Sequence, residues 1–200
     1  MRKLTIPLLA AMLSIAVACS PRDFLTRRLA ADLIVGSDVF RTTQQFWLRT
    51  GIIPNKDYLS PEYLVLQRHS WITASLVSCP PEVTPPPCQD VTFTPLGVET
   101  FRDLIPNSHS ASQYFEVPIA NRELIEVTGI SKNGNLADVD FSWRWVAVNE
   151  VGAALYSGGM KYNSSVGFKH YDDGWRLVEG GNSKNQLGLD DALKNAEPAR

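Results

Sequence analysis

The segment Ala137–Val146, with the sequence Ala-Asp-Val-Asp-Phe-Ser-Trp-Arg-Trp-Val, alternates apolar and polar side chains over its first nine positions. Successive side chains of a β-strand point to opposite faces of the sheet. One face of this strand would therefore carry the apolar residues Val139, Phe141, Trp143 and Trp145, and the other Asp138, Asp140, Ser142 and Arg144. Since so much aromatic surface has to be buried, the segment predicts a strand of an antiparallel sheet with one covered face.

The segments on either side of this strand predict its neighbours. Asn133-Gly134 predicts a tight hairpin turn, because both residues tolerate a positive φ. Further extended runs are predicted at 114–119, 122–130, 158–171 and 175–179, the last two joined by a turn at Asp172-Asp173-Gly174. These runs together predict a curved antiparallel β-meander over 109–181, followed by a polar, flexible tail over 182–200.

Residues 19–108 predict a mainly helical module. Leucines at four-residue spacing (Leu25, Leu29, Leu33) predict an amphipathic helix over 22–35, which Gly36-Ser37-Asp38 ends. The later predicted elements are a second helix carrying Val39, Phe40, Phe46, Trp47 and Leu48, a third from Ser60-Pro61-Glu62, and strands at 71–77 and 91–97. The expected fold class is therefore α+β, with this helical module packed against the C-terminal curved sheet.

The element order over 37–104 resembles that of a winged helix, and Thr92-Phe93-Thr94-Pro95-Leu96-Gly97 is similar to the motif that follows the wing strand. The resemblance implies DNA binding, but Leu96 stands where the family commonly has lysine. Residues 20–108 hold eight Lys and Arg against nine Asp and Glu, and the expected recognition helix offers Arg68 and His69 as its basic residues. Because DNA affinity depends on cations that neutralise phosphates, we expect a structural or protein-contact module and no nucleic-acid partner.

A second resemblance covers about residues 110–180. The closing sequence Asp173-Gly174-Trp175-Arg176-Leu177-Val178-Glu179 is similar to the final hairpin of cystatin-like and NTF2-like α+β domains. This resemblance implies an alternative in which the protein is an enzyme with a pocket over the aromatic sheet. His170 or an aspartate would then act as a general base.

The N-terminus predicts export. Arg2 and Lys3 precede an uncharged run, Leu4–Ala18, which as a helix would span about 22 Å, less than the roughly 30 Å of a bilayer core. Residues 1–18 therefore fit a signal peptide better than a membrane anchor. Ala16-Val17-Ala18-Cys19 resembles the lipobox of bacterial lipoproteins, with Ala16 where leucine is usual, and this implies that Cys19 becomes the lipidated first residue. Plain secretion and an uncleaved anchor remain alternatives.

The other two cysteines predict a disulfide. Once Cys19 carries lipid, Cys79 and Cys88 remain as a pair, and five of the thirteen prolines lie between them. An oxidising compartment favours a bridge that closes a proline-rich hairpin loop. A metal site is not expected, because the cysteine spacing is too long and no further ligand is near in sequence.

The sequence predicts no catalytic residues, metal or cofactor. His170-Tyr171-Asp172-Asp173 fits a solvated turn better than a general base, and the pair Asp138 and Asp140 fits a solvated sheet face better than a cation site. His69 and His109 are expected at the surface or at helix ends. Trp143 and Trp145, with Phe141, are expected in the core, and the alternative is that they form the wall of a ligand pocket.

The expected function is that of a non-catalytic lipoprotein of the cell envelope. It would bind an envelope protein or a small apolar ligand, and its lipid would hold it in a membrane, facing the periplasm from the outer membrane where two membranes exist. The 200 residues are 44 % apolar and 20 % charged with a net charge of −2, which excludes wholesale disorder and a general nucleic-acid binder. The alternatives are the NTF2-like enzyme and a membrane-tethered winged-helix regulator.

Overall fold

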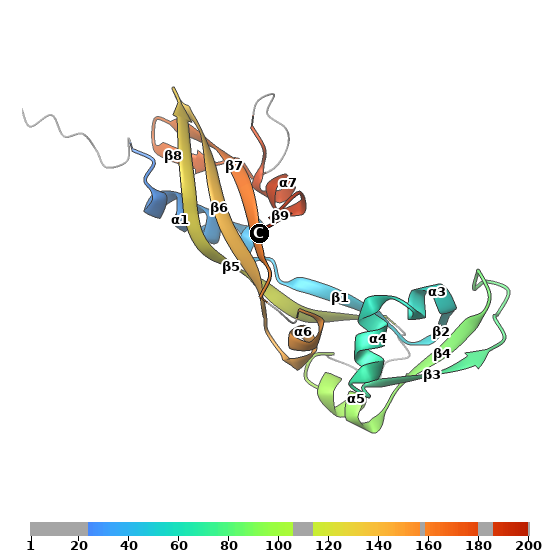
Figure 1. Cartoon of the computed structure of the whole chain (residues 1–200). Helices are drawn as coiled ribbons and strands as arrows, with labels where there is room; N and C mark the ends of the chain where they lie inside the picture. Colours follow the sequence, from blue (N-terminus) through green and yellow to red (C-terminus); the bar gives the residue numbers. More distant parts are fainter. Residues whose placement is uncertain (1–23, 106–113, 157–158, 180–185, 200) are drawn as a thin grey trace, which may run out of the picture.

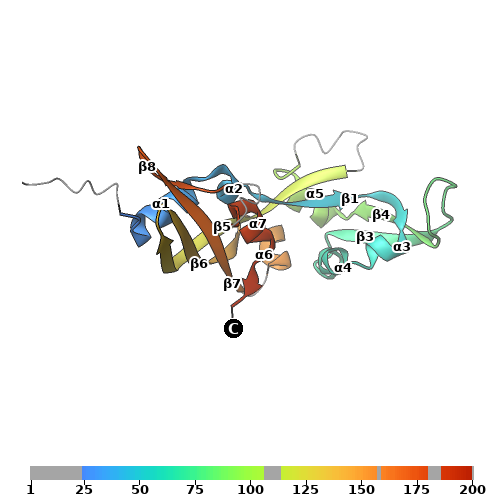
Figure 2. The same cartoon turned by 90° about the horizontal axis from the view of Figure 1, so that it is seen from above.

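The long strand β5 (Tyr114–Asn133) connects the two lobes of the molecule. The computed structural model describes residues 24–105, 114–156, 159–179 and 186–199, and these form an elongated α+β protein (Figure 1). The large lobe is built on an antiparallel sheet with strand order β1-β5-β6-β7-β8, in which β9 also pairs with β7. The small lobe contains a three-stranded antiparallel sheet of order β2-β4-β3, and β1 and β5 reach it from the large lobe (Figure 2).

The large sheet contains the strand from which the fold was predicted. Its other strands are β1 (Gln44–Arg49), β6 (Leu136–Ala147), β7 (Lys161–Tyr171), β8 (Gly174–Leu177) and β9 (Glu197–Pro198). The Asn133-Gly134 hairpin is confirmed, since Asn133 pairs with Leu136 and Gly134 has a φ of +62°. The runs at 114–119 and 122–130 are parts of one strand, β5.

The large sheet is curled into a half-barrel. Its β5–β6 ladder shifts register twice, between Leu124 and Glu126 and between Val127 and Gly129, and such bulges bend a strand and increase its twist. The apolar core lies against this sheet and includes side chains of three helices: α1 (Arg27–Gly36), α2 (Asp38–Arg41) and α7 (Leu189–Lys194). The predicted α+β class with a curved antiparallel sheet is confirmed.

Ser37 ends one helix and begins the next, as the sequence predicted. Its amide and hydroxyl donate to the carbonyl of Ile34, and its hydroxyl accepts from the amide of Phe40. The second helix is much shorter than predicted, because α2 ends at Arg41 and Phe46-Trp47-Leu48 lie in β1. The periodicity of this short apolar run does not distinguish a helix from a strand. The run forms a strand because it pairs with β5.

The small lobe has its own core. Its elements are β2 (Gly51–Pro54), α3 (Asn55–Tyr58), α4 (Pro61–Arg68), β3 (Ile72–Val77), β4 (Cys88–Phe93) and α5 (Pro95–Phe101). The predicted helix start at Ser60-Pro61 is confirmed by α4. The predicted strand at 91–97 is wrong beyond Phe93, because Thr94 accepts a hydrogen bond from the Gly97 amide and caps α5.

These differences change the expected element order. Strands β1 and β2 lie between α2 and α4, where the sequence predicted no strand. The two strands are separated by Thr50, and the chain passes from the large sheet into the small one at Gly51, whose φ of +76° suits glycine. The predicted disulfide between Cys79 and Cys88 is present and closes the β3–β4 hairpin.

The packing of the two lobes differs from the predicted division of the chain in two respects. A division near residue 108 does not separate two packed units, because α1 and α2 belong to the core of the large lobe while β1 pairs with β5. The tail is not loose over 186–199, since Leu189, Ala192 and Leu193 are buried in the same core. The apolar face of the half-barrel needs a cover, and the side chains of α7 supply part of it.

The leader, Cys19 and His109 lie outside the described residues.

Candidate binding site

Most of the predicted aromatic stripe is core. Trp143 is 2 % exposed, and its ring stacks on Tyr162 with 4.8 Å between the centroids. Its Nε1 donates to the Ser164 hydroxyl, which in turn donates to the carbonyl of Ala192 in α7. Phe141 is also buried, although it touches an open hollow of about 510 Å³ beside β7 and α7.

Trp145 lies where the core ends and the surface begins. It is partly buried, its ring is 5.3 Å from Trp143, and the Arg122 guanidinium lies 4.5 Å from its centroid. With Tyr156, Tyr162 and neighbouring residues it lines a small hollow of about 150 Å³. The alternative role as a pocket wall therefore fits Trp145 better than Trp143.

A larger groove lies at the junction of the two lobes, and we call it the waist groove. It has a volume of about 430 Å³, within the range of roughly 300–1,000 Å³ that is usual for ligand sites. It is lined by β1, α4, β5 and α6 (Glu150–Leu155) through Gln44, Gln45, Phe46, Trp47, Pro61, Glu62, Val65, Ile119, Leu155 and Tyr156. Leu155 and Tyr156 also line the small hollow beside Trp145, so the two spaces adjoin.

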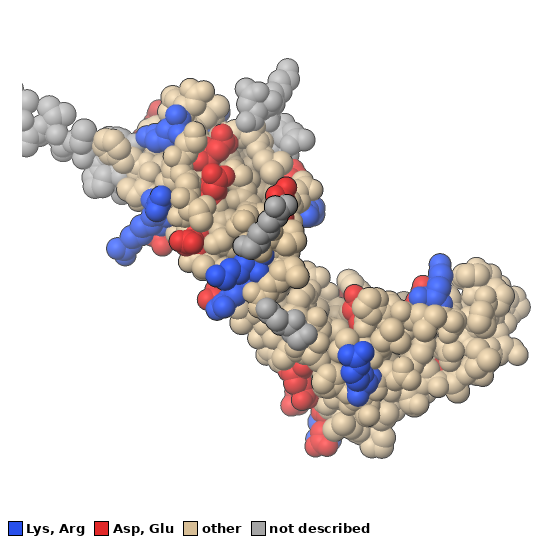
Figure 3. All heavy atoms as spheres, viewed as in Figure 1, with Lys and Arg blue, Asp and Glu red and all other residues tan. Residues whose placement is uncertain are grey.

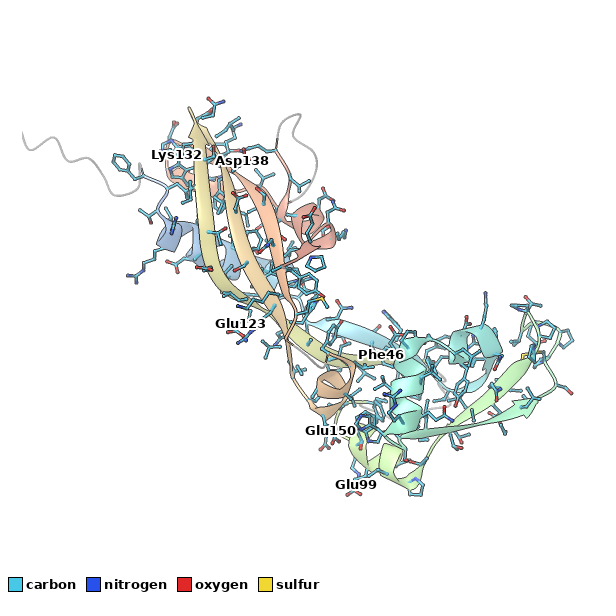
Figure 4. The ribbon with its side chains drawn as sticks, viewed as in Figure 1. Phe46, Glu99, Glu123, Lys132, Asp138 and Glu150 are labelled. Atoms are coloured by element: carbon cyan, nitrogen blue, oxygen red, sulfur yellow. A yellow bond between two sulfur atoms is a disulfide. The ribbon has the colours of Figure 1, made fainter. Side chains whose placement is uncertain are left out.

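The wall formed by α4 is held against β1 by Tyr63. The Tyr63 hydroxyl accepts from the Arg49 amide and donates to the Arg49 carbonyl, both at 2.8 Å. Its ring lies edge-on to Phe46 at 6.1 Å, and Figure 4 shows Phe46 beside α4. Burial raises the pKa of Tyr63, so the phenol remains a hydrogen-bond donor. These contacts fix the distance between helix and strand and leave the groove open beside Trp47.

The wall formed by α6 depends on a close approach to β5. Asn149 caps the helix by accepting from the Gly152 amide, and its side chain donates to the carbonyl of Pro118. A Cβ atom on Gly152 would lie 1.8 Å from the carbonyl oxygen of Ile119. Only glycine allows α6 to approach the backbone of β5 this closely, and this position of α6 brings Leu155 and Tyr156 into the groove.

The groove is mainly apolar and contains one charged side chain. Glu62 is that residue, and none of the ion pairs among the described residues involves it. The pKa of Tyr156 is raised by burial first and then by the nearby Tyr162 and Glu62. On the face shown in Figure 3, blue and red residues are interspersed, without a broad basic field.

Arg122 packs on Trp145, which lines the small hollow beside the groove. Its Nη1 donates to the carbonyls of Val39 and Thr42, which ties the end of α2 to β5. Burial lowers the pKa of Arg122, and the negative charge of Asp190 opposes this effect.

The polar candidates from the sequence do not form one site. His170 lies near the end of β7 as expected, but its ring packs 5.0 Å from Trp175 and its buried Nε2 has no hydrogen-bond partner. Asp138 and Asp140 are exposed, and the His69 ring stacks on Trp71. Within the described part of the chain, no group of three or more His, Cys, Asp or Glu residues is placed to hold a metal.

The sequence interpretation missed the waist groove. Its residues come from four segments far apart in the chain, and Phe46 and Trp47 were assigned to a helix. No local signal distinguishes them, because Leu48 and Trp47 are both apolar and yet Leu48 is fully buried while Trp47 is 63 % exposed.

Comparison of the chain with protein-family models, curated proteins and solved structures gives no match. None of the helices in the described segments is long and apolar enough to cross a membrane. The fold and the groove together define an α+β protein with an aromatic-lined surface site at the junction of its two lobes.

Proposed function

We propose that the protein is a non-catalytic lipoprotein of the cell envelope that binds a protein or a small apolar ligand in the waist groove. The observation that carries this proposal is the groove itself, an open apolar space bordered by Phe46, Trp47 and Tyr156. Apolar and aromatic walls with a few polar groups are typical of binding sites.

The envelope location is supported by the leader and by the cysteines. The sequence Ala16-Val17-Ala18-Cys19 behind Leu4–Ala18 favours lipidation. A disulfide between Cys79 and Cys88 fits an oxidising compartment, because such bridges are rare in the cytosol.

Binding is favoured over the two alternatives. An NTF2-like enzyme would need a pocket over the aromatic sheet, where side chains of α1 and α7 pack in one core with Phe141 and Trp143, and the hollow that Phe141 touches is open. A curved sheet packed on a helix supports a cystatin-like or NTF2-like architecture for the large lobe, without supporting catalysis. A winged-helix regulator is disfavoured by charge, because residues 20–108 hold eight Lys and Arg against nine Asp and Glu.

Lipidation gives the first test. The mature protein should begin at Cys19 and carry acyl chains, so that intact-mass measurement of detergent-extracted protein shows the lipid addition. Cys19→Ala should leave the leader uncleaved or release the protein from the membrane fraction. An unmodified Cys19 on a soluble mature chain would contradict the lipoprotein proposal while leaving the groove as a binding site.

Site-specific photocrosslinking in living cells tests the groove. Replacing the exposed Trp47 with p-benzoylphenylalanine should give a covalent adduct of discrete mass on irradiation. Adding Val65→Trp, which fills the groove from α4, should reduce the adduct by about tenfold, the effect of losing about 1.4 kcal/mol of binding.

The control is Leu64→Trp on the same helix. Leu64 is partly exposed and does not line the groove, so this change should leave the adduct yield unchanged. Equal yields from the Val65→Trp and Leu64→Trp proteins, both folded by circular dichroism, would show that the ligand binds elsewhere.

A further inference from the structure

The backbone of β1 faces the waist groove. Four consecutive residues, Gln44 to Trp47, line this one space. Side chains alternate between the two faces of a strand, so four neighbours cannot all reach a groove that lies on one face. The strand therefore meets the groove with its edge, and main-chain groups form part of the wall.

The direction of these main-chain groups follows from Arg49. Its N–H and C=O both bond to Tyr63 on α4, so they point away from β5. In an antiparallel pair, every second residue directs its N–H and C=O to the same side. Pairing with β5 is regular from Gln45 to Arg49, and the register shift falls before Gln45. Trp47 and Gln45 therefore also point away from β5, toward the groove.

These groups are available to a further strand. Among the described residues, no hydrogen bond outside the β1–β5 ladder engages the backbone of Trp47. The Gln45 carbonyl accepts a 3.3 Å bond from the side chain of Gln44, which can move aside. Edge strands with free N–H and C=O groups pair readily with another chain, and proteins usually protect them.

We infer that the waist groove takes an extended peptide segment of a partner protein, which adds as a strand to the outer edge of β1. The inference rests on the proposed function and names the class of its ligand. Trp47 and Gln45 would supply the main-chain hydrogen bonds, and alternate apolar side chains of the peptide would pack against Phe46 and Tyr156. This is the β-addition mode of peptide recognition, in which main-chain bonds give affinity and pockets give specificity.

The charge of the groove selects among such peptides. Glu62 is the charged residue of the lining, and no cation among the described residues forms an ion pair with it. A lysine or arginine in the peptide would meet this carboxylate and could also lie against the exposed ring of Trp47. Exposed ion pairs are weak, so exchanging lysine for glutamate in the peptide should weaken binding by about three- to tenfold.

The test uses the full-length lipidated protein in detergent micelles. A pool of fluorescent, acetylated heptapeptides with apolar residues at alternate positions and one lysine is screened by anisotropy. The best binder is then synthesised with a single N-methyl group at each backbone position in turn. Addition to β1 predicts losses of about tenfold or more at every second position and small changes between them, because alternate amides face the strand.

Protein variants supply the matched controls. Val65→Trp should weaken peptide binding by about tenfold or more and Leu64→Trp should leave it unchanged, since Val65 lines the groove and Leu64 does not. Glu62→Lys should reverse the preference, weakening the lysine peptide and improving the same peptide with glutamate.

The outcomes separate this inference from the function on which it rests. No binder in the pool, or N-methyl losses without alternation, would overturn strand addition. If the crosslinker at position 47 still forms an adduct in cells, and Val65→Trp still reduces that adduct, the groove remains a binding site. Absence of both the adduct and the peptide would refute the groove as a site altogether.

Discussion

Trp143→Ala should lower the free energy of unfolding by about 3–5 kcal/mol, the usual cost of truncating a buried aromatic side chain. Trp143 is nearly inaccessible, stacks on Tyr162 and donates its indole N–H to Ser164. The substitution would leave a cavity between the half-barrel and α7, and Ser164 would lose a hydrogen-bond donor. Equilibrium unfolding in urea, followed by far-UV circular dichroism, measures the change. A loss of this size is a large fraction of the 5–15 kcal/mol typical of native proteins.

The matched control is Trp47→Ala, the same substitution at a ring that is 63 % exposed. Surface changes usually stay within about 0.5 kcal/mol, so this variant should unfold like the parent. If Trp143→Ala kept full stability and instead abolished the photocrosslink at Trp47, Trp143 would belong to a ligand site and its assignment to the core would fail.

Gly97→Ala and Gly152→Ala should each destabilise the protein by about 3 kcal/mol or more, at or beyond the upper end of ordinary overpacking. A Cβ atom at Gly97 would lie 1.8 Å from the carbonyl oxygen of Trp71, and one at Gly152 would lie as close to that of Ile119. Both obstacles are backbone, so neither can turn away as a flexible side chain would. Thermal and urea unfolding of the two variants measures the effect.

Gly36→Ala provides the control, because a Cβ atom there meets nothing within 4 Å. This residue ends α1, and alanine costs less in a helix than glycine, so the change should be neutral or stabilising by about 0.5–1 kcal/mol. If Gly36→Ala destabilised the protein as much as Gly152→Ala does, the backbone contact with Ile119 would not explain the loss of stability in Gly152→Ala.

Several parts of the fold could be predicted from local sequence. The period-two alternation of Ala137–Val146 predicted β6, and the two residues Asn133-Gly134 predicted its hairpin. The capping residue Ser37 and the first-turn proline Pro61 also predicted their helix starts, because both signals depend on residues within one turn. The Cys79–Cys88 bridge followed from a small number of cysteines close in sequence.

Other parts could not be predicted, because distant contacts decide them. Residues 46–48 form a strand since β5 offers them a pairing partner, although their apolar run also suits a helix. Residues 186–199 pack into the fold although their sequence is largely polar, because the core of the large lobe buries Leu189 and Leu193. Gly97 was assigned to a strand, and its close contact with the Trp71 carbonyl exists only after the small lobe has formed.

By itself the sequence determined the α+β class, the aromatic core strand and its hairpin, the disulfide pair and the helix starts at Ser37 and Ser60-Pro61. Each of these depends on side-chain alternation, turn geometry or capping over a few neighbouring residues. The tertiary structure alone decided the waist groove, because its walls come from residues 44–47, 61, 62, 65, 119 and 155–156. Its open strand edge also depends on Tyr63 holding α4 at a set distance from β1. Spacing between segments is set by packing, and packing is a property of the assembled cores rather than of any one segment.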